Sequence, residues 1–99
     1  MDKIEILVIG RNLEILQTVV RLINKNQDWN ATGVVTDDEA IATFNLKPFK
    51  LILLGGGIDK RSEDNLCATF NSKNPDIIIV QHYGGGSGLL YSEIYPILR

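Results

Sequence analysis

The sequence predicts an α/β fold in which four parallel strands form an open sheet with helices on both faces. Three apolar runs have the length of buried strands, and each leads into glycine: Ile4–Ile9 before Gly10, Leu51–Leu54 before Gly55, and Ile77–Val80 ahead of Gly84. A segment with helical features follows each run. Strands that alternate with helices of this length imply parallel pairing through right-handed crossovers.

The first half of the chain predicts two strands and two helices. Asn12 stands at a helix cap position before apolar residues at helical spacing, and that helix ends near residues 25–26. A second strand is expected over Ala31–Val35. Trp29, just before it, is either an exposed contact residue or a cover for the first strand and helix. Thr36 and Glu39 have the spacing of a capping box, which opens a helix through Phe44.

The second half predicts two further strand and helix pairs. Pro48 stops the preceding helix, and a strand starting at residue 49 or 50 ends at Leu54. Ser62 is the expected cap of the third helix, whose buried face includes Leu66, Cys67 and Phe70. A fourth strand follows over residues 77–82, and Ser87 caps a last helix. The predicted order is (βα)4, a three-layer sandwich with strand order 2-1-3-4.

Composition limits the classes of protein that fit. The 99 residues suit one domain spanning 1–99, with 44% apolar and 22% charged residues. A net charge of -2 provides no basic surface for nucleic acid or a membrane. The single cysteine excludes an internal disulfide, and the start of the chain lacks a signal-peptide pattern, so a cytoplasmic protein is expected.

The loops beyond the strand carboxyl ends are the expected ligand region. Glycine-rich loops can direct backbone N–H groups at an anion, and nearby cations would favour a phosphate-bearing guest. The candidate anion site comprises Gly10, Arg11, Gly55, Gly56, Gly57, Lys60, Arg61, His82, Gly84, Gly85, Gly86 and Ser87. The alternative is that the glycines serve only the short turns and the cations only contact solvent.

No catalytic residues, metal ligands or cofactor are predicted. His82 has no visible partner for acid–base chemistry, and Cys67 lies at a core position of its helix. Asp37, Asp38 and Glu39 fit a helix cap and first turn, where negative charge is favoured for structural reasons. One glycine after the first strand argues against a dinucleotide fold.

Over nearly its whole length the chain resembles the response-regulator receiver domain, a flavodoxin-like fold. Residues 3–9, 32–37 and 50–54 are similar to the first three strands of that family. The resemblance implies an acidic pair for magnesium after the first strand, where Gly10 and Arg11 stand, and a phosphoacceptor aspartate at Gly55. Gln81 replaces the family's hydroxyl residue, and the fifth strand with its lysine is missing. A degenerate, truncated receiver is therefore expected.

Two classes of function follow. The first is a receiver-like interaction module that acts without phosphorylation and self-associates or docks on a signalling partner. The second is a protein or enzyme that holds a phosphate-bearing small anion at the glycine-rich strand ends. A homodimer is expected, because the fourth strand is an apolar edge without proline or lysine. Its candidate interface comprises Ile77, Ile78, Ile79, Val80, Tyr91, Tyr95, Ile97 and Leu98.

Overall fold

A computed structural model describes residues 3–55 and 57–81 of the chain. Its elements are β1 (Ile4–Ile9), α1 (Leu13–Asn24), β2 (Trp29–Val34), α2 (Asp37–Phe44), β3 (Leu51–Leu54), α3 (Lys60–Lys73) and β4 (Ile78–Gln81). The strands form one parallel sheet in the order β2-β1-β3-β4. The predicted fold class and strand order are confirmed. The helix expected from Ser87 lies outside the described residues.

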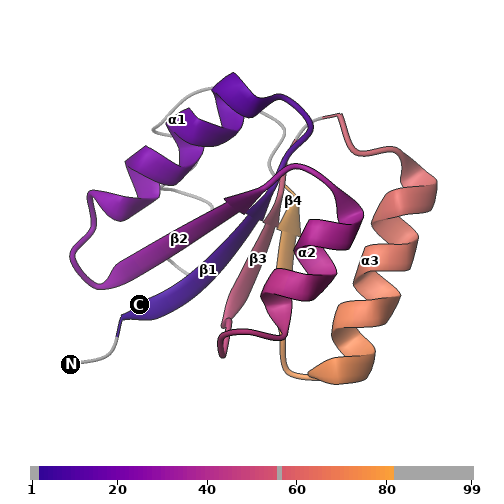
Figure 1. Cartoon of the computed structure of the whole chain (residues 1–99). Helices are drawn as coiled ribbons and strands as arrows, with labels where there is room; N and C mark the ends of the chain where they lie inside the picture. The colour runs from indigo at the N-terminus through magenta and orange to yellow at the C-terminus, as the bar shows by residue number, and fades with distance from the viewer. Residues whose placement is uncertain (1–2, 56, 82–99) are drawn as a thin grey trace.

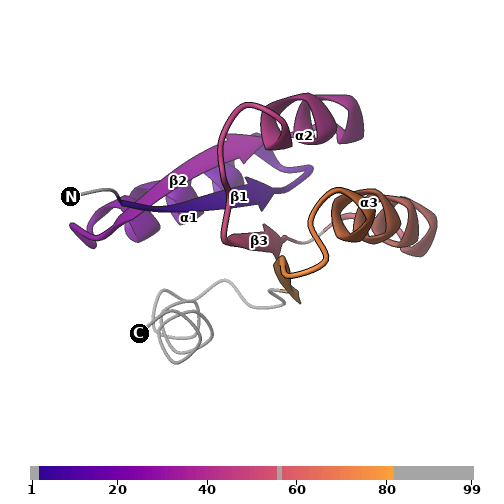
Figure 2. The same cartoon turned by 90° about the horizontal axis from the view of Figure 1, so that it is seen from below.

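The helices divide between the two faces of the sheet. Figures 1 and 2 show α1 on one face and α2 with α3 on the other, which gives the three layers that the sequence predicts. Alternate residues of a strand point to opposite faces, so β1 contributes to both sides. Ile6 and Val8 pack in the core under α1, whereas Leu7 and Ile9 pack in the core under α2 and α3.

Aromatic side chains fill the core beneath α2 and α3. The ring centroids of Phe44 and Phe70 are 4.7 Å apart in a tilted arrangement, and those of Phe44 and Phe49 are 6.2 Å apart in a stacked one. All three rings are buried. Pairs of this kind add about 0.5 to 1.5 kcal/mol each beyond the burial of their area. They therefore fix both helices against the sheet.

The helix starts follow their caps, with one correction. The side chain of Asn12 accepts a hydrogen bond from the backbone N–H of Ile15 at 3.1 Å, and Thr36 forms the predicted capping box with Glu39. The prediction for α3 is wrong. Asp59 is its N-cap, accepting from the backbone N–H of Ser62 at 2.8 Å, so Ser62 lies inside the first turn.

Both edge strands differ slightly from their predicted bounds. β2 begins two residues before Ala31, at Trp29, whose side chain is buried in the core under α1. This settles the open question about Trp29 in favour of a core role. The fourth strand was expected over residues 77–82, whereas β4 begins at Ile78. Ile77 is buried just ahead of the strand, and residue 82 lies outside the described part.

Among the helices that the structure describes, none is both long enough and apolar enough to cross a membrane.

Candidate functional site

The carboxyl ends of β1, β2 and β3 meet at one edge of the sheet, and the loops after them form the candidate site. Two backbone hydrogen bonds hold these loops together. The N–H of Gly10 donates to the carbonyl of Val34 at 3.1 Å, and the N–H of Gly55 donates to the carbonyl of Ile9 at 2.7 Å. These bonds continue the hydrogen bonding of the parallel sheet into the loops, so the loops are fixed to the ends of the strands.

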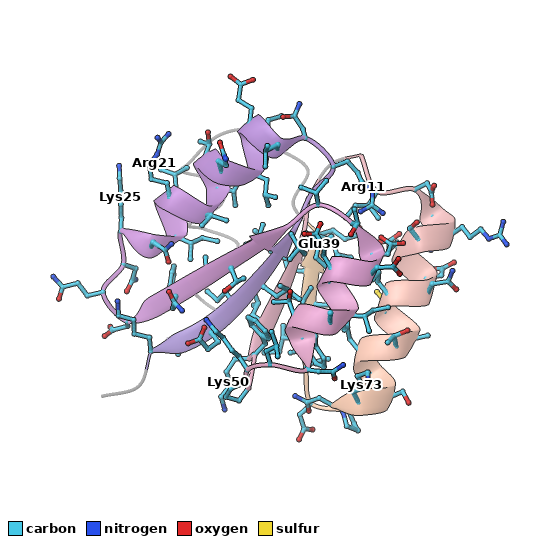
Figure 3. All side chains as sticks on the ribbon, in the orientation of Figure 1. Arg11, Arg21, Lys25, Glu39, Lys50 and Lys73 are labelled. Atoms are coloured by element: carbon cyan, nitrogen blue, oxygen red, sulfur yellow. The ribbon has the colours of Figure 1, made fainter. Side chains whose placement is uncertain are left out.

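Arg11 is the central side chain of this edge (Figure 3). Its Nη1 donates to the backbone carbonyl of Val35 at 2.6 Å, and its Nη2 is paired with a carboxylate oxygen of Asp37. Both side chains are about two-thirds buried, with 30% and 34% of their surface exposed. The guanidinium therefore binds the start of α2 to the end of β1.

Gly57 lies over the stem of Arg11. Its φ of +86° belongs to the left-handed region, and a Cβ atom there would come within 3.1 Å of the Arg11 Cβ. Any other residue at position 57 would incur both backbone strain and a close contact. The loop after β3 therefore closes over the side chain that the loop after β1 supplies.

Asp59 adds a second carboxylate to the neighbourhood of Arg11. The backbone N–H of Ser62 lowers the pKa of Asp59 from its ordinary value of 3.8, and the charge of Arg11 acts in the same direction. A helix N-terminus also favours a carboxylate. The edge thus holds one partly buried cation, Arg11, which is paired with the carboxylate of Asp37 and also acts on the charge of Asp59.

The structure brings together some of the residues predicted for the anion site. Gly10, Arg11, Gly55 and Gly57 converge at the edge. Lys60 lies in the first turn of α3, 81% exposed, where it pairs with Asp64 at 3.1 Å and Glu63 at 4.0 Å. Arg61 is exposed beside it. The remaining candidates lie outside the described residues: Gly56, His82, Gly84, Gly85, Gly86 and Ser87.

The sequence prediction missed the two carboxylates that face Arg11. Asp37 was assigned to helix capping alone, although it also lies one turn from the end of β2. The carboxyl ends of parallel strands share an edge, so the place of Asp37 just after β2 was the sequence signal for its pairing with Arg11. The anion site stays a prediction. Of its three described cations, Arg11 and Lys60 each already pair with a carboxylate of this chain, and Arg61 is exposed.

A small hollow lies beyond the ends of β3 and β4. Its volume is about 50 Å³, and it is lined by Leu54, Gly55, Ile58, Glu63 and Gln81. The Glu63 side chain is 16% exposed. This space suits a water molecule and not a nucleotide or sugar phosphate, which need several hundred Å³.

The remaining titratable candidates do not gather into a reactive group. Burial raises the pKa of the Cys67 thiol, which disfavours the reactive thiolate. In residues 3–55 and 57–81, no three His, Cys, Asp or Glu side chains lie close enough together to hold a metal ion.

Comparison with known proteins identifies the fold. No protein-family model matches the sequence, and no curated protein does. Among solved structures, a pilus assembly protein, CpaE, from Burkholderia thailandensis matches with 19% identity and a TM-score of 0.64, over 79% of this chain and 66% of that chain. The lactose-specific IIB component domain of the phosphotransferase system from Streptococcus pneumoniae matches with 13% identity and a TM-score of 0.68. That match covers 93% of this chain and 88% of the IIB chain.

These matches define the fold of the chain. It has a flavodoxin-like α/β fold, shared with the pilus assembly protein and with the IIB component domain. It spans less than two thirds of the length of the pilus assembly protein structure. At these identities the likeness concerns the fold, and the function has to be argued from the residues of this chain.

Proposed function

We propose that the chain is a degenerate receiver-like interaction module, which acts without phosphoryl transfer to an aspartate and associates with a second copy of itself. The observation that carries this proposal is Gly55. The resemblance to receivers implies a phosphoacceptor aspartate directly after the third strand, and the residue directly after Leu54 is a glycine.

The surroundings of Gly55 support a position adapted to glycine. A Cβ atom there would lie 3.1 Å from the carbonyl oxygen of Ile9 and 3.6 Å from the Cα of Gly10. The first contact is tighter than ordinary van der Waals packing, and a backbone atom has little freedom to withdraw. An aspartate would need the loop after β1 to shift before its carboxylate could face the site.

The charge of the edge also supports this proposal. The acidic pair implied by the resemblance is replaced by Gly10 and Arg11. Arg11 pairs with Asp37 and so supplies a permanent cation at the place where a receiver would recruit magnesium. We infer that this ion pair holds the edge loops in one arrangement, as a rigid platform for protein contacts.

Self-association is argued from β4, which is the last strand on one side of the sheet formed by residues 3–55 and 57–81. Its sequence, Ile78–Gln81, contains neither proline nor a charged residue to discourage pairing with another strand. Ile78 is 38% exposed, and Ile79 and Val80 are half-buried. We propose that two copies meet at this edge about a two-fold axis, with a total interface of at least about 1,000 Å².

Light scattering coupled to size-exclusion chromatography tests the assembly. We expect twice the 11.0 kDa chain mass at high micromolar concentration, and Ile78→Lys should return the protein to the monomer. Leu46→Lys is the matched control, because Leu46 is 79% exposed and outside β4. A wild-type monomer, or an Ile78→Lys dimer of unchanged affinity, contradicts assembly at this edge.

A further inference from the structure

A hollow beside α1, at the β2 side of the sheet, is much larger than the one at the carboxyl edge. Its volume is about 560 Å³. We call it the α1 groove, and its lining residues are Leu13, Leu16, Gln17, Val20, Arg21, Asn24, Lys25 and Gly33. The volume is in the range of sites that bind a few side chains of a partner or a small ligand.

Close packing of α1 on β2 creates the floor of the groove. A Cβ atom on Gly33 would lie 2.9 Å from the Val20 Cγ2 and 3.2 Å from the Leu16 side chain. Because position 33 has no side chain, the helix approaches the strand directly, and apolar atoms of Leu16 and Val20 form the floor. Gly33 itself is exposed.

Leu13 extends this apolar floor toward solvent. It lies three residues before Leu16 and seven before Val20, which is one continuous stripe of a helix. Leu13 is 57% exposed, so the apolar stripe remains accessible to a partner at this end of the groove. Ile15 is equally exposed but does not line the groove.

The charges that line the groove are both positive. Figure 3 shows Arg21, in the last turn of α1, and Lys25, just after the end of that helix, extending away from the body of the molecule. Within the described residues, neither has a carboxylate within 4.0 Å, whereas Arg11, Lys47 and Lys60 do. Because both charged side chains that line the groove are cations, the groove is locally complementary to the carboxylates of an acidic partner.

The backbone of β2 favours an extended occupant. The N–H of Ala31 points away from β1, to the outer edge of the described sheet, where the Asn24 side chain accepts its hydrogen bond at 2.7 Å. Backbone groups two residues apart point the same way, so the N–H and C=O of Gly33 also face this edge. The Asn24 side chain thus occupies the edge at Ala31, whereas Gly33, two residues further along the strand, lies beside the groove.

We propose that the α1 groove binds an extended acidic peptide segment of a partner protein. An aliphatic side chain of the peptide enters the floor beside Leu13, Leu16 and Val20, its backbone pairs with Gly33, and its carboxylates contact Arg21 and Lys25. Strand addition with a side-chain pocket is a common mode of peptide recognition. This proposal gives the interaction module its partner chemistry and rests on that proposed function, but it uses a surface separate from β4.

Selection from a displayed library of random twelve-residue peptides on the full chain tests the proposal. We expect enriched peptides that combine aliphatic with acidic residues and that lose binding to the double variant Arg21→Glu, Lys25→Glu. The control variant, Lys50→Glu with Lys73→Glu, reverses two cations at another end of the molecule (Figure 3) and should bind normally. No enrichment, basic consensus peptides, or equal binding to both variants would overturn it.

Two single substitutions test the apolar floor. Leu13→Gln should weaken an enriched peptide about tenfold, the effect expected from losing much of one buried leucine contact. Ile15→Gln, on the same helix and equally exposed, should leave binding unchanged. Equal effects would overturn the groove as the site. If Leu13→Gln instead shifts the monomer–dimer equilibrium, the occupant of the groove is a second copy and the peptide proposal is wrong. The Ile78→Lys test of assembly at β4 does not depend on this result.

Discussion

The guanidinium of Arg11, from the loop after β1, is paired with the carboxylate of Asp37, in the first turn of α2. The two residues are 26 positions apart in the sequence. Arg11 also donates to the carbonyl of Val35, so one side chain joins the ends of β1 and β2. The edge of the sheet therefore holds an ion pair between two side chains of this chain.

Loss of Arg11 should destabilise the fold more than loss of the charge on Asp37. Arg11→Ala removes both hydrogen bonds and the stem beneath Gly57, and we expect the free energy of unfolding to fall by about 1 to 3 kcal/mol. Asp37→Asn keeps an oxygen acceptor and should cost less. Urea unfolding of both variants and of the double variant checks this. Additive effects in that cycle would show that the two side chains do not interact.

The absence of a side chain at Gly33 should matter for packing, and Gly10 provides the matched comparison. Gly33→Ala places a methyl group 2.9 Å from Val20, so we expect a cost of about 1 to 3 kcal/mol, as in other overpacked positions. At Gly10 the nearest atom is 3.7 Å away, which is ordinary contact. Gly10→Ala should therefore be close to neutral in thermal unfolding, and Val20→Ala should relieve the cost of Gly33→Ala. A neutral Gly33→Ala would mean that α1 does not lie so close to β2.

The cap of α3 gives the protein a predictable pH dependence. The pKa of Asp59 is lowered in the fold below its ordinary value of 3.8, chiefly by the backbone N–H of Ser62. Its contribution to stability is therefore fully present above that value and is lost as the pH falls through the folded pKa. Asp59→Asn keeps the cap without the charge. Wild type should exceed it in melting temperature near pH 7, and the difference should vanish well below pH 3.8. A difference that is independent of pH would contradict the assignment.

The sequence carries most of the information on the fold because its elements are signalled locally. β1 is apolar except at Glu5 and has the predicted bounds. β3 is a continuous apolar run that ends at Leu54 as predicted, but it begins at Leu51 and not at residue 49 or 50. The capping box of Thr36 and Glu39 fixes the start of α2 within a few residues. Parallel order then follows from the alternation of strands and helices, which is a general rule of connection and not a property of single residues.

Two kinds of feature could not be predicted from the sequence. One depends on contacts between residues that are distant in the sequence, and the other on a choice between two neighbouring residues that are equally suited to the same position. Asp59 and Ser62 are both good cap residues, and the buried positions Leu66 and Phe70 do not decide which one starts the helix. The pairing of Arg11 with Asp37 depends on the loops after two different strands meeting, which spacing cannot show. The α1 groove likewise depends on Gly33 lying beneath Val20, a contact between two elements.

We propose above that no aspartate of this chain accepts a phosphoryl group, and intact-mass measurement after incubation with acetyl phosphate and Mg²⁺ tests this most directly. A receiver domain that retains its acceptor serves as the positive control in the same reaction. We expect the mass of this chain to stay unchanged, because Gly55 offers no carboxylate and Arg11 replaces the acidic pair. An acid-labile adduct of one phosphoryl group per chain, removed by hydroxylamine, would contradict the account.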